Sequence, residues 1–163
     1  MQPRQAYTAK QITEVLRIYP KTLSYWVKKG IIVPEIWNPS GRGTTRLFSP
    51  YNVYEIALVR ELAKDELPLT SIRRILDVLE QRQFFRDFES RFEEGLLEEN
   101  HLYLIWARDY TGDDADLIEI NEIRVPEDWG NLHIHFWERV LVFNLTMLCV
   151  RIFAELDRAG VWL

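Results

Sequence analysis

The chain has 163 residues, of which 47% are hydrophobic and 28% charged, and its formal net charge is -5. A chain of this length can bury about 70% of the surface that its unfolded form exposes, which is enough for one domain or two small ones. The single cysteine, Cys149, excludes an intrachain disulfide, and charged residues interrupt the apolar runs, which argues against a membrane span. We therefore expect a cytoplasmic protein with no membrane partner.

Charge is unevenly divided along the chain. Residues 1–50 carry eight basic side chains and two acidic ones, a net charge of +6, so the remaining residues carry -11. A basic segment attached to an acidic body is typical of a module that binds a polyanion and is joined to a domain with another role. The charge pattern thus predicts a nucleic-acid partner for the first third of the chain.

Residues 8–16 and 20–30 predict two short helices. The first begins with Thr8 as an N-cap and carries an apolar stripe, and the second begins near a proline and ends at Gly30. Only three residues, RIY, separate the two segments. Two short helices joined by so tight a turn form a helix-turn-helix.

The following segment, residues 31–48, interrupts helical periodicity with prolines and glycines, which predicts a hairpin with a Gly-rich tip. Ser49-Pro50 supplies the N-cap and the first-turn proline of a third helix, and a fourth helix follows Pro68. A helix-turn-helix, a hairpin and two further helices describe a winged helix-turn-helix domain over residues 1–80.

A connecting helix over residues 81–100 and a small α+β domain over residues 101–163 are predicted to follow. Phenylalanines recur in the connecting segment at roughly helical spacing, and two strand-like segments beyond it flank the turn sequence TGDD. ERVLVF predicts a third strand before a helix capped by Asn144, while one unbroken helix over residues 132–158 stays open as an alternative. The predicted fold class is α+β, mainly α.

Several short motifs occur in the order and spacing of a known family: YT at residue 7, PKTLSYWVKKGII at residue 20, TTRLFS at residue 44 and LPLTSIRRIL at residue 67. On these motifs, residues 7 to about 79 resemble the N-terminal domain of the MerR family of transcription regulators. The resemblance implies a sequence-specific, DNA-binding transcription regulator that binds a two-half-site operator in double-stranded DNA as a homodimer. It also implies RNA polymerase as a further partner.

Three residues depart from the family pattern. Ser24 stands where the family commonly has arginine, Glu66 replaces a glycine between the third and fourth helices, and Pro68 replaces a capping serine or threonine. We therefore expect one DNA contact to be missing or replaced and the junction near Glu66 to differ in shape.

The candidate DNA-binding residues form two groups. The first lies on the second helix, on a side that can enter the major groove, and comprises Lys21, Thr22, Ser24, Tyr25 and Lys28. The second lies on the wing, where glycines let the backbone approach a phosphate, and comprises Arg42, Thr44 and Arg46. Trp26, between Tyr25 and an apolar valine, is expected in the core.

The sequence offers no pairing of a nucleophile with a base, no phosphate loop and no metal-ligand spacing, so we expect no enzyme, no catalytic residue, no cofactor and no metal. His133 and His135 lack a third ligand nearby in the sequence. An alternative function is an architectural DNA-binding or protein-interaction adaptor without a small-molecule effector. The Phe-rich helix and the apolar segment 140–156 are the surfaces expected for self-association, and an effector pocket in the C-terminal part stays open.

Overall fold

The computed structural model describes residues 6–37, 45–93, 101–108, 116–123 and 139–160. The chain divides into two compact units: the first unit comprises residues 1–80 and 151–163, and the second unit comprises residues 81–150. Among the described residues, helices predominate over short strands. The predicted class, α+β and mainly α, is confirmed.

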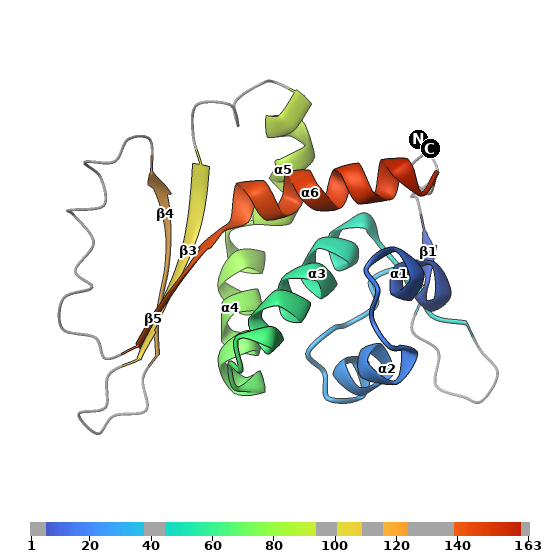
Figure 1. The fold of residues 1–163 in the computed structure, drawn as a ribbon, viewed down its shortest axis with the longest axis horizontal. Helices are drawn as coiled ribbons and strands as arrows, with labels where there is room; N and C mark the ends of the chain where they lie inside the picture. Colours follow the sequence, from blue (N-terminus) through green and yellow to red (C-terminus); the bar gives the residue numbers. More distant parts are fainter. Residues whose placement is uncertain (1–5, 38–44, 94–100, 109–115, 124–138, 161–163) are drawn as a thin grey trace. The chain divides into compact units, whose positions relative to one another are not determined.

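The N-terminal segment of the first unit forms the helices α1 (Ala9–Val15), α2 (Pro20–Lys28), α3 (Pro50–Lys64) and α4 (Leu69–Gln81), which Figure 1 shows gathered in one group. Helix α1 begins with a capping box, because Thr8 Oγ1 accepts a hydrogen bond from Gln11 N and Gln11 Oε1 accepts one from Thr8 N, at 3.3 and 2.8 Å. Ser49 caps α3 in the same manner. Local start signals therefore set the helix starts, and the predicted helix-turn-helix is confirmed.

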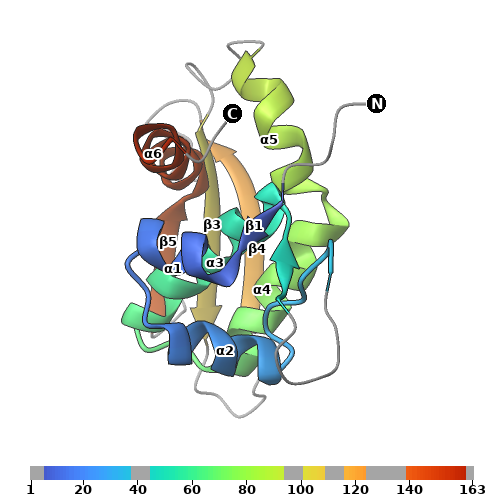
Figure 2. The same ribbon diagram turned by 90° about the vertical axis from the view of Figure 1, so that its right-hand side faces the viewer.

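A short hairpin accompanies these helices. Strand β1 (Tyr7–Thr8), seen in Figure 2, pairs antiparallel with β2 (Leu47–Phe48). Trp37 exchanges two backbone hydrogen bonds with Leu47, at 3.1 and 2.9 Å. The two segments that lead into and out of the predicted wing therefore run antiparallel. Its tip, with Arg42 and Thr44, lies outside the described residues.

Residues with left-handed backbone follow the ends of α1, α2 and α3: Arg17 (φ 51°), Gly30 (φ 70°) and Glu66 (φ 59°). After α1, Ile18 N donates to Thr13 O at 3.0 Å, and after α2, Ile31 N donates to Trp26 O at 2.9 Å. These bonds span the C-termini as in the Schellman motif. Glu66 keeps the left-handed conformation for which the resembled family uses glycine.

The core of the first unit lies between the helices and β2. Its largest side chains are almost fully excluded from solvent, and they include Tyr7, Leu16, Leu23, Trp26, Phe48, Tyr54 and Leu62. Burying one large apolar side chain stabilises a fold by about 1.5–3 kcal/mol. The core placement expected for Trp26 is confirmed, and Leu23 and Trp26 together hold α2 against the rest of the unit.

The second unit contains α5 (Phe84–Glu93) and a three-stranded antiparallel sheet in the order β4-β3-β5, formed by β3 (His101–Arg108), β4 (Asp116–Ile123) and β5 (Arg139–Asn144). On the central strand, Leu104 pairs with Ile120 and with Phe143. Four successive residues of this strand, 104–107, are buried, so both faces of the strand are covered.

Helix α6 (Leu145–Arg158) follows β5 directly, and Asn144 caps it by accepting a hydrogen bond from Met147 N at 2.9 Å. Residues 139–158 therefore form a strand followed by a helix, as predicted, and the alternative of one unbroken helix is wrong. Phe84, Phe85 and Phe88 of α5 are buried within the single chain, so these rings are not a free surface for self-association. Among the described helices, none is long and apolar enough to cross a bilayer.

Candidate nucleic-acid interface

The outward side of α2 carries a polar stripe. Lys21, Ser24, Tyr25 and Lys28 are exposed, and their spacing of three, four and seven residues puts them on one face of the helix. Thr22 is half-buried beside them. Since Leu23 and Trp26 are buried, packing of the opposite face fixes the direction in which this stripe points.

A concave pocket of about 280 Å³ joins this stripe to the start of α1 and to the outgoing strand of the hairpin. Its lining residues are Thr8, Ala9, Lys10, Leu23, Ser24, Val27, Thr45, Arg46 and Phe48. The structure thus brings together Ser24 and Arg46, which come from the two predicted groups. Lys21, Thr22, Tyr25 and Lys28 do not line the pocket, and Arg42 and Thr44 fall outside the described residues.

The pocket also contains Lys10 and Thr8, which were not among the predicted site residues. The Lys10 side chain is 83% exposed, and its ammonium lies 3.9 Å from Glu14, a weak surface pair in solvent. Its charge therefore remains available to an anion. The high proportion of basic residues in the first 50 positions could have pointed to Lys10 as a candidate. The position of Lys10 in the pocket, however, depends on the pairing of β1 with β2, which the charge pattern does not reveal.

Asn52 holds the segment that leads into the hairpin. Its Oδ1 accepts hydrogen bonds from Glu35 N (2.9 Å) and Ser49 N (3.3 Å), and its Nδ2 donates to Val33 O (3.1 Å) and Glu55 Oε2 (2.7 Å). These four bonds use the full capacity of a side-chain amide. Because Asn52 is 1% exposed, it fixes residues 33–35 to the start of α3 with no competition from water.

Glu55 lies next to Asn52 in an acidic environment. Burial raises the pKa of Glu55 to about 7, the hydrogen bond from Asn52 opposes this rise, and the negative charges of Glu35 and Glu80 add to it. Arg73 is the cation that lowers this pKa, with a smaller effect than the others. The carboxyl of Glu55 is therefore half-protonated near neutral pH.

We expect Glu55→Gln to remove a pH dependence of stability. A raised folded-state pKa means that the folded chain binds the proton on Glu55 more tightly than the unfolded chain does. The stability that this proton contributes is therefore fully present below about pH 4.5 and is lost as the pH rises through 7. Glutamine keeps the acceptor for Asn52 without the charge. The variant should gain on the order of 2 kcal/mol at pH 8 and nothing at pH 4.5, as measured by urea unfolding at both values. An equal gain at both would contradict the explanation.

Two arginines satisfy carbonyls at the ends of the helix-turn-helix. Arg60 Nη1 of α3 donates to Leu16 O at 2.6 Å, and Arg73 Nη1 of α4 donates to Ile31 O at 3.2 Å. The last carbonyls of a helix lack partners within it, so such donors stabilise the ends. Asp77 pairs with Arg73 at 2.5 Å and balances its charge. Helices α3 and α4 thereby hold both helices of the motif in place.

Within the described part of the chain, His, Cys, Asp and Glu side chains form no group of three or more that could hold a metal ion. His133 and His135 lie outside that part. Cys149 is fully buried, and burial raises the pKa of its thiol, so it packs as a small core side chain rather than as a thiolate.

Comparison with known proteins agrees with this geometry. Residues 7–79 match the family model described as MerR HTH family regulatory protein. HTH-type transcriptional regulators of Mycobacterium bovis and Mycobacterium tuberculosis are 29% identical to the chain over 76 residues, which is 47% of this chain and 34% of theirs. The chain therefore matches about a third of the length of these relatives. The match falls on the helix-turn-helix, the hairpin, α3 and α4, so this part of the chain is similar to the MerR HTH family.

Proposed function

We propose that the chain is a sequence-specific transcription regulator that binds a two-half-site operator in double-stranded DNA as a homodimer. One observation carries the proposal: the exposed stripe of α2 adjoins a pocket shared by Lys10, Ser24 and Arg46. Duplex DNA presents a dense row of phosphates beside a major groove that admits a helix. A polar helix face beside basic side chains from two other segments fits that combination.

In this arrangement α2 is the recognition helix. Lys21 and Thr22 lie in its first turn, where they would contact base edges, while Ser24, Tyr25 and Lys28 continue the stripe along the groove. Arg46, with Arg42 and Thr44 of the wing, would contact the sugar-phosphate backbone. We further propose that the protein acts in the cytoplasm and that RNA polymerase is its partner at the promoter, without catalytic activity of its own.

The test of sequence readout is a binding selection from randomised duplexes with the full chain and with Lys21→Ala and Thr22→Ala. Each variant should lose preference at one position per half-site, because a good contact to a base edge discriminates by about 1–3 kcal/mol. Arg74→Ala, which removes an exposed cation from α4, serves as the control and should return the parental motif. If both recognition-helix variants return that motif unchanged, base readout comes from elsewhere. A selection that yields no motif would favour the architectural alternative.

Changes in the wing should act on affinity rather than on preference. Arg46→Ala should weaken binding to all duplexes by a similar factor, and the slope of log affinity against log salt should flatten by about 0.9, as expected for one lost phosphate contact. Titrations at several salt concentrations measure this slope, with Arg74→Ala again as the control. An unchanged slope would exclude Arg46 from the interface with phosphate.

A further inference from the structure

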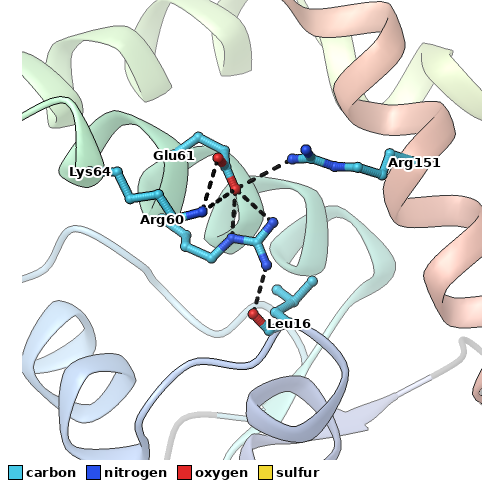
Figure 3. Close-up of polar contacts among 5 residues, drawn as sticks. All are labelled: Leu16, Arg60, Glu61, Lys64 and Arg151. Atoms are coloured by element: carbon cyan, nitrogen blue, oxygen red, sulfur yellow. Dashed lines mark hydrogen bonds and ion pairs between the residues drawn. The ribbon is translucent and has the colours of Figure 1, made fainter.

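A cluster of charged side chains joins α3 to α6 within the first unit (Figure 3). Glu61 Oε1 lies 2.7 Å from both Nε and Nη2 of Arg60 and 3.3 Å from Nη2 of Arg151 on α6, and Lys64 Nζ lies 3.2 Å from each carboxylate oxygen. The side chains of Arg60 and Glu61 are each only 16% exposed. Three cations from two helices therefore share one largely buried carboxylate.

The guanidinium of Arg60 faces in two directions. Its Nε and Nη2 bind Glu61, and its Nη1 donates to Leu16 O at 2.6 Å. Leu16 is the last residue before the left-handed Arg17, and the turn from here leads to Pro20, where α2 begins. Arg60 can reach this carbonyl in a fixed orientation because Glu61 holds the other edge of its guanidinium.

Glu61 keeps its charge in this setting. Burial acts to raise the pKa of Glu61, but the hydrogen bonds and charges of Lys64 and Arg60 outweigh burial, so the pKa lies below its ordinary value. The carboxylate is therefore ionised at neutral pH and can bind Arg60 and Arg151 together. Ile152 and Leu156, next to and five residues beyond Arg151, are fully buried, which fixes the second half of α6 in the first unit.

We propose that Arg151, Glu61 and Arg60 are positioning residues for the recognition helix, and that α6 thereby adjusts the DNA affinity of the MerR-family domain. Arg151 anchors Glu61 from α6, Glu61 orients Arg60, and Arg60 holds the turn before α2. None of the three lies on the polar stripe or lines the pocket beside it. The effect of α6 on binding is therefore exerted through the turn, and it rests on the proposed DNA-binding function.

The first test measures amide hydrogen exchange in the 163-residue protein without DNA. The probe is the Ile18 amide, which donates to Thr13 O and closes the turn. Arg151→Gln should speed its exchange by about fivefold, the size expected for a half-exposed ion pair, and Arg60→Gln by about tenfold or more. In the Arg60→Gln background, Arg151→Gln should add no further change, since Arg151 acts through Arg60. Arg151→Lys should restore part of the protection.

Arg158→Gln is the matched control, because Arg158 lies on the same helix and its Nε donates to Ala154 O of α6 itself. It should leave the Ile18 amide unchanged. The proposal would be overturned if the Ile18 amide of Arg151→Gln exchanged at the wild-type rate. It would also be overturned if Arg151→Gln accelerated this exchange equally in the wild-type and the Arg60→Gln backgrounds. Equal acceleration at every slow amide would also overturn it, because Arg151 would then stabilise the unit as a whole.

The second test measures DNA affinity with the same variants. Arg151→Gln and Arg60→Gln should weaken binding by about fivefold or more while leaving the salt slope unchanged, because neither side chain contacts phosphate. A flatter salt slope for Arg151→Gln would show that Arg151 contacts phosphate, and this would overturn the proposal. If the unaltered protein binds no duplex, the proposed function fails, whereas the exchange result on the free protein still decides whether α6 holds the turn.

Discussion

Replacing Asn52 by alanine is expected to lower the free energy of unfolding of the first unit by about 3 kcal/mol, the largest loss expected from any single polar side chain described above. Alanine would leave Ser49 N, Glu35 N and Val33 O without the partner they have now, and Asn52 is almost fully buried. A buried donor or acceptor left unpaired costs about 1–3 kcal/mol. Exchange of the slowest amides of α3 measures the loss.

Two further variants show whether the hydrogen bonds are the cause. Asn52→Asp keeps the acceptor but replaces the donor with a carboxylate that faces Val33 O and Glu55, so it should destabilise more at pH 8 than at pH 5. Asn144→Ala makes the same chemical change at an exposed cap bond of α6, where the expected cost is only about 1 kcal/mol. Equal losses for Asn52→Ala and Asn144→Ala would show that the four-bond arrangement adds nothing beyond an ordinary cap.

Asn52→Ala should also weaken DNA binding. Val33 and Glu35 begin the segment that leads to Trp37 and the hairpin, and Asn52 fixes both to α3, while Ser49 Oγ donates a further hydrogen bond to Glu35 Oε2. With the bonds to Asn52 lost, the hairpin that carries Arg46 would be held less firmly and would need to be ordered on binding, at an entropic cost. Affinity should therefore fall at temperatures where Asn52→Ala is still folded.

The helices of the first unit were predictable because their signals are local. Thr8 with Gln11, Ser49 with Pro50, and Gly30 each act within about four residues of the helix end that they define, and the structure uses each of them. The exposed stripe on α2 follows from helical periodicity once Trp26 is taken as core. A sequence pattern therefore predicted which face of α2 is exposed without any knowledge of tertiary contacts.

The contacts that hold this face in place were not predictable in the same way. Arg60 binds a carbonyl 44 residues away and Arg73 one that is 42 residues away, and on a helix each looks like an ordinary solvated cation. Asn52 looked like a polar residue in a first helical turn, while its partners Val33 and Glu35 lie 19 and 17 residues earlier. Such pairs depend on the packing of several helices, which no short sequence window contains.

The C-terminal half shows a second limit. ERVLVF and the following segment were compatible with a strand plus a helix or with a longer helix, because short apolar runs suit either state. Pairing of β5 with β3 decides in favour of the strand. The grouping of residues 151–163 with the first unit had no sequence signal at all, since Arg151 stands inside an apolar run and its partner Glu61 is 90 positions earlier.

The second large effect is expected for paired half-sites. The exposed stripe of one α2, acting as the proposed recognition helix, would read few base pairs, and each mismatch costs only about 1–3 kcal/mol, so one copy would not supply much specificity. In a homodimer, binding of the first half-site makes the second contact intramolecular, which raises affinity by about 10²–10⁴ without new contacts. We therefore expect the 163-residue protein to bind a two-half-site duplex at least 100-fold more tightly than a duplex with one half-site.

Sedimentation of the protein and titration of both duplexes at one salt concentration test this expectation together. A duplex with the half-sites separated by an extra half turn is the control, since it keeps every base but puts the second site on the opposite face, and the gain should disappear there. Because Phe84, Phe85 and Phe88 are already buried, a dimer must use other residues than these rings. A monomer in sedimentation that binds both duplexes equally well would show that one copy recognises its site alone, and specificity would then have to come from a longer contact than the α2 stripe provides.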